Sequence, residues 1–307
     1  MDYVVKTNGL TKRVKGIELV AEISLRIERG EIYGLLGQNG AGKTTIMKML
    51  TGLTHPTRGG IELFGSPLTP NRRQPLERVG SIIEYPIFFE HLSAWQNLRL
   101  HCDLLGYYDD KAIHQALEFV QMTDSGDKPV KNFSLGMKQR LGIARAIVTK
   151  PELIVLDEPT NGLDPLGIKD MRDLIRMLNQ EYGITFLVSS HILGEIEQVA
   201  DRIGVIHQGR LINEVALAEL RHQRLEYLEL VTTDTERAVF LLEHELNVAN
   251  MKIVEDRRIR IYDSSVPQHD ITKLLVGRGI GIEELQKHAG SLEEYFYRQI
   301  HGGGQVG

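Results

Sequence analysis

The chain has 307 residues, 42% of them hydrophobic, which suits a globular protein with one large domain or two ordinary ones. Its net charge of −5 disfavours a nucleic-acid partner, because nucleic-acid-binding proteins usually carry a basic surface. The one cysteine, Cys102, excludes an internal disulfide or a cysteine-based zinc site and suits the cytosol. No apolar run approaches the roughly 18 residues of a membrane-spanning helix, and the first ten residues lack signal-peptide features. We therefore expect any link to a membrane to run through a partner.

Short apolar runs predict buried strands of an α/β fold with a parallel sheet. Three of them read as strands buried on both faces: Ile32–Leu36, Leu153–Leu156 and Ile184–Val188. Another run, Val79–Ile83, ends on the carboxylate of Glu84. Polar or glycine residues follow each run, and open α/β sheets bind ligands at the carboxyl ends of their strands. An isolated Glu84 would be an ordinary solvated charge, so its meaning depends on the neighbouring motifs.

Helical patterns lie between the predicted strands Ile32–Leu36 and Leu153–Leu156. Ser93–Gln96 has the spacing of a capping box at a helix start. Trp95, Leu98, Cys102 and Leu105 follow at helical spacing. This stripe predicts a packing face rather than a cofactor site.

The character of the sequence changes after about Val215, and residues 216–300 predict an accessory α+β domain. The expected elements have the β-α-β-β-α-β order of a ferredoxin-like unit. They are Tyr227–Val231, a helix capped by Asp234 and running to about Leu246, a hairpin of Met251–Val254 and Arg258–Tyr262, a helix at Ile271–Val276, the segment Ile280–Ile282, and a last helix opened by Ser291–Glu294. The glycine-rich tail, residues 301–307, is expected to be disordered.

The stretch GQNGAGKT, residues 37–44, fits the phosphate-binding pattern G-x-x-x-x-G-K-[ST] between a predicted strand and a predicted helix. Glycines let backbone N–H groups converge on phosphate oxygens, and the helix N-terminus adds its positive end. Lys43 is expected to reach the β- and γ-phosphates and Thr44 to ligate Mg²⁺. The alternative, an ordinary glycine turn, does not explain the strand and helix on either side. The nucleotide-binding residues expected here are Gly37, Asn39, Gly40, Gly42, Lys43, Thr44 and Thr45.

Ionisable side chains lie at the ends of two further predicted strands. Asp157 is placed to hold Mg²⁺, and Glu158, the next residue, to act as the general base that polarises the attacking water. His191 ends the third strand and is expected to contact the γ-phosphate, so that Lys43, Glu158 and His191 form the catalytic set. Two solvated acids and a structural histidine are the alternative, which the nearby phosphate loop disfavours.

A third motif, NFSLGMKQRLGIARA at Asn132–Ala146, is similar to the L-S-G-G-Q signature of ATP-binding-cassette (ABC) ATPases. Ser134 and Gly136 match that signature, whereas Phe133, Leu135 and Met137 depart from it. The resemblance covers nearly the whole chain. It implies a P-loop ABC ATPase core over residues 1–215, with a parallel or mixed sheet and a helical subdomain at about 86–148.

By the same resemblance, two ATP molecules are sandwiched in a head-to-tail dimer. Ser134 and Gly136 then bind the γ-phosphate held by the other subunit, and Asp164 lies in the loop that links the two sites. Val14 occupies the place of the usual adenine-stacking aromatic residue. Because valine has no stacking face, we expect weak discrimination between ATP and GTP.

Glutamate at position 84 is similar to a feature of one branch of this family. Most of these ATPases have glutamine at this place, which touches Mg²⁺ and senses the membrane partner. Glutamate here, with SIIEYPIF and the SLEEYF ending, resembles the ATPases of bacitracin and lantibiotic export or immunity transporters. We expect Glu84 to contact both the nucleotide and the metal, with its carboxylate adding negative charge beside the γ-phosphate.

The resemblance implies a separate membrane permease as partner, a second ATPase subunit in a homodimer, and a peripheral location on the cytoplasmic face of the membrane. The region from Tyr85 to about Lys131 would carry the docking surface, with Pro86, Phe88, Phe89 and Trp95 as candidate contacts. Simple core packing of these aromatics is the alternative.

Two other functions share this fold. A soluble mechanical ABC ATPase usually has two cassettes or a long coiled coil, and this chain has one cassette and no heptad run. A regulatory ATP-binding module is disfavoured by Glu158 and His191 together. The transported substrate and the direction of transport are not encoded in motifs of an ATPase subunit.

Overall fold

The computed structural model describes residues 2–218, 226–248, 250–255, 257–263 and 266–289. The chain forms two compact units, residues 1–218 and 219–307, which are described separately. The sequence placed this change at about Val215. The helix expected from Ser291 and the tail 301–307 lie outside the described residues.

A six-stranded sheet in the first unit positions the expected site. Its strand order is β11-β10-β4-β9-β8-β7, parallel throughout except for β11 at one edge. The strands are β4 (Ile32–Leu36), β7 (Val79–Ile82), β8 (Leu153–Leu156), β9 (Thr185–Ser190), β10 (Arg202–His207) and β11 (Arg210–Ala216). Every residue of β4, β8 and β9 is buried, which explains their continuous apolar character. The predicted parallel strands are thus present, and the carboxyl ends of β4, β7, β8 and β9 meet at one edge.

A second, antiparallel sheet covers the phosphate-loop helix. Its strands are β1 (Tyr3–Val14), β2 (Ile17–Ile23), β3 (Arg26–Glu28), β5 (Arg58–Leu63) and β6 (Ser66–Pro67). Helix α1 (Lys43–Leu50) places Ile46 and Met47 in one core cluster with residues of both sheets, such as Leu63 from β5 and Leu35 from β4. Packing from both sides fixes the position of α1 and therefore of its N-terminus.

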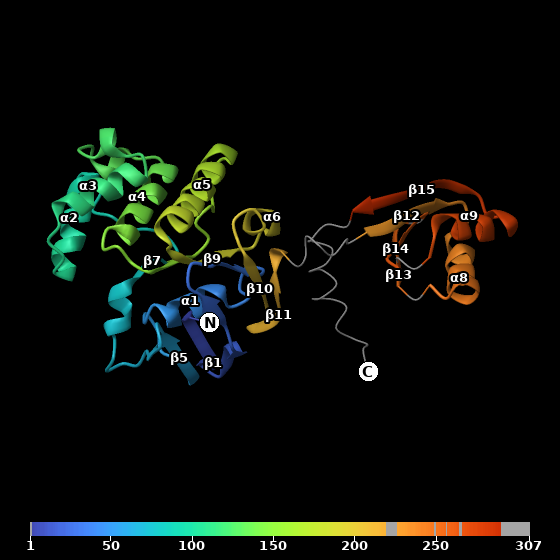
Figure 1. Ribbon diagram of the computed structural model, residues 1–307, viewed down its shortest axis with the longest axis horizontal. Helices are drawn as coiled ribbons and strands as arrows, with labels where there is room; N and C mark the ends of the chain where they lie inside the picture. The colour runs from blue at the N-terminus through green and yellow to red at the C-terminus, as the bar shows by residue number, and fades with distance from the viewer. Residues whose placement is uncertain (1, 219–225, 249, 256, 264–265, 290–307) are drawn as a thin grey trace. The chain divides into compact units, whose positions relative to one another are not determined.

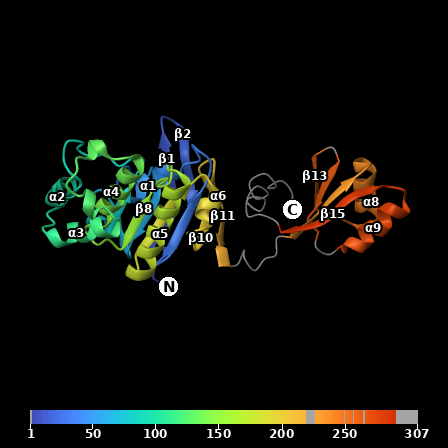
Figure 2. The same cartoon turned by 90° about the horizontal axis from the view of Figure 1, so that it is seen from above.

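The helical region lies between β7 and β8 in the sequence and forms a separate group in both views (Figures 1 and 2). It contains α2 (Ala94–Leu105), α3 (Asp110–Phe119), α4 (Leu135–Ile147) and short 3-10 turns at Thr123–Ser125 and Val130–Asn132; another 3-10 turn, Gln74–Arg78, precedes β7. The predicted capping box is confirmed, because the Ser93 side chain accepts from the Gln96 amide and the Gln96 side chain accepts from the Ser93 amide.

The predicted packing stripe of α2 is only partly correct. Leu98 and Cys102 are buried and Trp95 is half-buried, but Leu105 is 58% exposed. Leu105 is the last residue of α2, which ends at the left-handed Gly106. The helix therefore ends before a further turn could cover Leu105.

The chain returns from the helical region through β8 to α5 (Pro165–Tyr182), then through β9 to the short α6 (Leu193–Ile196). No helix among residues 2–218 or the described parts of the second unit combines the length and apolarity needed to cross a bilayer.

The second unit has the element order β-α-β-β-α-β in its described residues. Its elements are β12 (Glu226–Thr232), α8 (Thr235–Leu246), β13 (Met251–Glu255), β14 (Arg258–Ile261), α9 (Gln268–Gly277) and β15 (Ile282–Ala289), and its antiparallel sheet has the order β13-β14-β12-β15. Leu230 and Ile259 pack with Leu242 and Ile271 in its core. The strand expected at Ile280–Ile282 instead begins at Ile282 and continues to Ala289, because pairing with β12 extends a segment whose side chains are mostly polar.

Candidate nucleotide site

The phosphate loop joins β4 to α1, and two glycines are required by its path. Gly42 has φ of 109°, and a Cβ there would lie 2.8 Å from the Leu19 carbonyl oxygen. A Cβ on Gly37 would lie 2.5 Å from the Ile206 carbonyl oxygen. No side chain caps α1 at Gly42. The amides of its first turn and the positive end of the helix dipole are therefore available to a phosphate group.

Lys43 is 5% exposed and turns back over this loop. Its Nζ donates to the carbonyl oxygen of Gly37 at 2.6 Å and lies 3.1 Å from Oε1 of Glu158. A bound β- or γ-phosphate would take the place of these acceptors. The lysine is thus positioned over the phosphate loop.

Asp157 follows β8, is 3% exposed, and uses both carboxylate oxygens. Oδ2 accepts from the Thr44 hydroxyl at 2.8 Å, and Oδ1 accepts from the Ser189 hydroxyl at 2.7 Å. A hydroxyl and a carboxylate side by side are hard oxygen donors of the kind that bind Mg²⁺ together with substrate phosphates. These residues therefore fit the expected metal.

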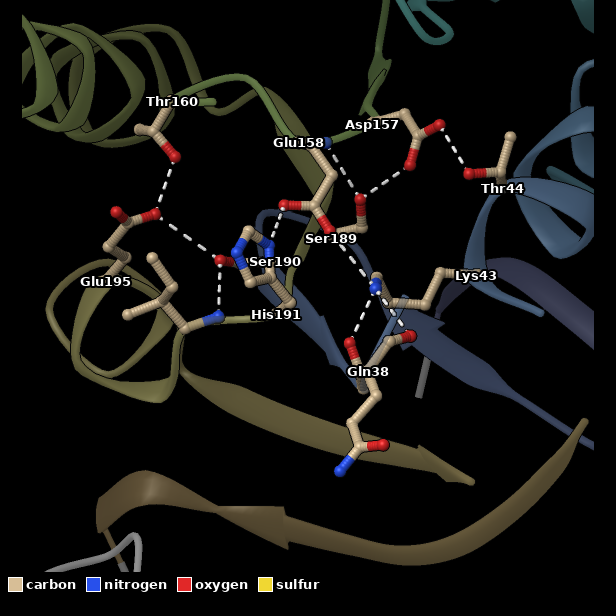
Figure 3. A network of polar contacts seen from close by, with 12 residues as sticks. Gln38, Lys43, Thr44, Asp157, Glu158, Thr160, Ser189, Ser190, His191 and Glu195 are labelled. Carbon is tan, nitrogen blue, oxygen red and sulfur yellow. Dashed lines mark hydrogen bonds and ion pairs between the residues drawn. The ribbon is translucent and has the colours of Figure 1, made fainter. Parts of the chain in front are cut away.

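The Glu158 side chain, just after β8, lies between the side chains of Lys43 and His191 (Figure 3). Its Oε1 faces Lys43, and its Oε2 lies 2.8 Å from Nδ1 of His191 at the end of β9. The backbone of Glu158 is left-handed, with φ of 49°, which turns the chain sharply after the strand. The side chain is 19% exposed, and its Oε1, which faces Lys43, is buried. The predicted trio of Lys43, Glu158 and His191 is brought together by three different strand ends.

Ser189 is a residue of this site that the sequence reasoning missed. It is fully buried in β9, donates to Asp157, and accepts from the backbone amide of Glu158 at 2.9 Å. It thereby fixes both consecutive acids. The sequence feature that could have revealed Ser189 is the pair of hydroxyl residues, Ser189 and Ser190, at the end of an otherwise apolar strand. Ser190 and Thr160 both contact Glu195 of α6, which joins the loop after β8 to that helix.

Glu84 ends up beside α1, one turn beyond Thr44. Its Oε1 lies 2.5 Å from Nζ of Lys48, and its side chain is 60% exposed. Its backbone is also left-handed, with φ of 62°. The structure thus places Glu84 at the expected sheet edge but engages it with Lys48, a partner that the sequence did not suggest. Its contact with a metal stays a prediction.

Ser134 and Asp164 each begin a helix. The Ser134 hydroxyl accepts from the Met137 amide at 3.3 Å at the start of α4, and Asp164 accepts from the Gly167 amide at 3.0 Å at the start of α5. A Cβ on Gly136 would lie 3.7 Å from Leu163. The signature segment therefore adjoins the loop of Asp164.

Val14 ends β1 and faces Ile17 across a tight hairpin turn. The two side chains are 42% and 66% exposed, and Leu19 further along β2 is 40% exposed. Since the Leu19 carbonyl touches Gly42, this apolar hairpin face belongs to the strand that flanks the phosphate loop. Contact between Val14 and a nucleobase stays a prediction.

The candidate docking residues divide into two kinds. Phe89 is 62% exposed, whereas Pro86, Phe88 and Trp95 are half-buried. Pro86 packs against Gly142 of α4, where an added Cβ would lie 3.0 Å away. Core packing therefore accounts for part of this set and leaves Phe89 on the surface.

Comparison with known proteins gives the same assignment as the geometry. The family model described as ABC transporter matches residues 20–161. The chain is 55% identical over 302 residues to the uncharacterized ABC transporter ATP-binding protein YcbN of Bacillus subtilis, covering 98% of each chain. It is 44% identical over 307 residues to the bacitracin transport ATP-binding protein BcrA of Bacillus licheniformis, covering 100% of both. It is 43% identical over 211 residues to the lantibiotic transport ATP-binding protein SrtF of Streptococcus pyogenes, covering 69% of this chain and 90% of that one.

Among solved structures, cbiO1 from Clostridium perfringens, part of the ABC transporter complex cbiONQ, aligns with a TM-score of 0.66 and 26% identity, covering 81% of this chain and 98% of that one. The phosphate loop, the acids after β8 and the histidine after β9 thus occur in a fold shared with transport ATPases. This chain belongs to the ABC transporter ATP-binding proteins and is an ATPase of the branch that includes the bacitracin and lantibiotic transport ATP-binding proteins.

Proposed function

We propose that this chain is the ATP-hydrolysing subunit of a transporter that exports or expels a peptide antibiotic of the bacitracin or lantibiotic type, for resistance or self-immunity. The observation that carries this proposal is the similarity to a bacitracin transport ATP-binding protein over the whole of both chains. Glu84, two residues past the end of β7, supports the same branch.

In this proposal ATP binds with Mg²⁺, and the ion would be held by Thr44 and Asp157, where it offsets charge on the phosphates. Ser189 holds the Asp157 carboxylate in this position by donating a hydrogen bond to it. Lys43 moves away from Glu158 and binds the phosphates. The Glu158 carboxylate is then free to accept a proton from the attacking water. His191 orients Glu158 through its 2.8 Å contact and adds a polar group near the γ-phosphate.

The working unit in this proposal is a head-to-tail homodimer on a separate permease at the cytoplasmic face of the membrane. Two features support the dimer. The helix starts at Ser134 and Asp164 adjoin each other through Leu163. A helix N-terminus with a hydroxyl donor suits a phosphate supplied from outside its own subunit. We also propose that residues 216–300 form a ferredoxin-like accessory domain and that residues 1–215 carry the cassette.

The test combines partner capture with drug susceptibility. The tagged chain is purified from gently solubilised native membranes, and the proteins that come with it are identified by mass spectrometry. In parallel, a deletion strain is complemented with wild type, Glu158→Gln, or the control Glu181→Gln, which makes the same chemical change at an exposed position on α5. We expect a polytopic permease in the wild-type sample, and resistance restored by wild type and Glu181→Gln only.

Two results would overturn the proposal. One is a deletion strain as resistant to bacitracin and lantibiotics as its parent. The other is recovery of soluble partners alone, which would leave the nucleotide chemistry intact and remove the assigned role. The membership of this chain among transport ATP-binding proteins already disfavours the alternative of a soluble ABC ATPase without a transport partner.

A further inference from the structure

Glu195 of α6 is an acid of the network in Figure 3 that the proposed mechanism does not use. Its Oε2 accepts from the Thr160 hydroxyl at 2.6 Å and from the Ser190 hydroxyl at 3.4 Å. Among the residues that the structure describes, Glu195 forms no ion pair, and Arg172, which lines the same small cavity, donates to Gln198 instead. The carboxylate of Glu195 therefore serves the two hydroxyl groups.

The two hydroxyl residues flank the proposed catalytic pair. Thr160 follows Glu158 by two residues, and Ser190 directly precedes His191. The contact between Oε2 of Glu158 and Nδ1 of His191 is 2.8 Å long, so it depends on the spacing of the two segments that carry these side chains. Because one oxygen of Glu195 accepts from both segments, it ties the loop after β8 to the end of β9.

Ser190 transmits this tie to the turn that carries His191. It is 3% exposed, and its hydroxyl accepts from the Ile192 amide at 3.0 Å while it donates to Glu195. The His191 side chain is 36% exposed, so packing holds the imidazole only weakly. The direction in which His191 points therefore depends on the backbone turn between Ser190 and Ile192.

Helix α6 presents Glu195 from a fixed position. Ile196, the next residue, is 1% exposed, and a Cβ added to Gly34 would lie 2.7 Å from its Cγ2 atom. A glycine in β4 therefore allows α6 to pack closely against the strand that leads into the phosphate loop. This packing makes α6 a firm support for a residue that aligns the strand ends beside it.

We propose that Glu195 is a positioning residue for ATP hydrolysis, which holds the loop after Glu158 and the turn at His191 at the spacing that keeps the imidazole against the carboxylate. It acts through Thr160 and Ser190 and takes no part in the chemical step itself. A misplacement of about 1 Å can cost a catalytic group roughly a hundredfold in rate. This inference rests on the roles proposed above for Glu158 and His191, and it does not depend on the transported substrate.

The test measures phosphate release by the isolated ATPase, at protein concentrations where the specific activity no longer depends on concentration. Glu195→Ala removes the acceptor, whereas Glu195→Gln keeps an amide oxygen that can accept from both hydroxyls. Glu197→Ala is the matched control, because Glu197 is also half-buried, at the end of α6, and its side chain makes no hydrogen bond or ion pair within the described parts of the chain.

We expect Glu195→Ala to lower kcat about tenfold to a hundredfold, while KM and the dissociation constant of a fluorescent ATP analogue stay within about twofold of wild type. Glu195→Gln should retain kcat within about threefold, and Glu197→Ala should match wild type. Thr160→Val should lose part of the rate, and Thr160→Ser, which keeps the hydroxyl, should not.

A double variant shows whether Glu195 acts through His191. In a His191→Gln background, Glu195→Ala should lower kcat by less than about twofold, because the contact that it positions is already gone. A residue that only stabilises the fold would lower the rate by the same factor in both backgrounds.

Four results would overturn the inference or separate it from the proposed roles. Wild-type kcat in Glu195→Ala, with Glu158→Gln slow, would refute the inference alone. An equal loss in both His191 backgrounds, with a lower thermal midpoint and weaker ATP binding, would make Glu195 a purely structural residue. A rate in Glu195→Gln as low as in Glu195→Ala would show that its charge, and not its contact with the hydroxyls, matters. Wild-type turnover in Glu158→Gln would remove the assigned base and the inference with it.

Discussion

Replacing Glu158 by glutamine should have two opposite effects, slower hydrolysis and tighter ATP binding. Hydrolysis should fall because glutamine cannot accept the proton of the attacking water, and loss of a general base costs roughly a hundredfold to ten-thousandfold in rate. Binding should improve because Glu158 holds Lys43 at 3.1 Å in the structure, and the lysine must leave this ion pair to reach a phosphate.

The size of the binding effect follows from this contact. Two unit charges 3.1 Å apart attract by roughly 5 kcal/mol at an effective dielectric constant near 20, before desolvation is subtracted. Lys43 is 5% exposed and Glu158 is 19% exposed, so most of that attraction is offset by the cost of removing both from water. Removing an ion pair whose net contribution is about 1 kcal/mol should lower the dissociation constant for ATP roughly fivefold.

The assay is equilibrium titration with a fluorescent ATP analogue, alongside steady-state phosphate release. His191→Gln is the informative comparison, because it removes the 2.8 Å contact with Oε2 but leaves the Lys43 pair in place. It should slow hydrolysis without tightening ATP binding. Wild-type turnover in Glu158→Gln would refute the assignment of the base. Unchanged affinity would refute the idea that Glu158 competes with phosphate for Lys43.

Four further predictions concern residues around this site and the helical region. Ser189→Ala should lower the free energy of unfolding by about 1–3 kcal/mol and raise the KM for MgATP, because Asp157 loses a buried donor; a thermal midpoint and KM equal to wild type would contradict this. Glu84→Gln should leave ATP affinity unchanged but alter the resistance obtained per ATP hydrolysed, and equal resistance with equal ATPase rates would count against it. Wild type should use ATP and GTP with similar kcat/KM, and Val14→Tyr should tighten ATP binding about twofold to tenfold through stacking; a strong ATP preference in wild type would be inconsistent with an exposed valine at this place. The pKa of His101 is about 4, below its unfolded value near 6.5, so stability present above pH 6.5 should decrease as pH falls from 6.5 towards 4; urea midpoints should show this slope in wild type and not in His101→Gln.

The sequence by itself determined the strands and the loop chemistry. Ile32–Leu36 and Leu153–Leu156 are fully buried strands at the expected bounds, because a strand covered on both faces must be apolar throughout. The pattern of residues 37–44 predicted a phosphate loop, and two of its glycines, Gly37 and Gly42, are required by backbone approaches that leave no room for a Cβ. Since parallel strands share one carboxyl edge, the residues after β4, β8 and β9 had to meet.

Only the tertiary structure decided which groups touch. Ser189 was overlooked because its role depends on lying opposite Asp157 in the neighbouring strand, a pairing that spans 32 residues of sequence. The pairing of Glu84 with Lys48 and the exposure of Leu105 depend equally on where helices end and which elements lie beside them. The contact of the Arg145 guanidinium with the Ile87 carbonyl oxygen is a further example, because it joins residues 58 positions apart in the sequence. A sequence shows where acids and bases stand along the chain, but ion pairs form between groups that folding brings within about 4 Å, and only the folded structure shows which groups these are.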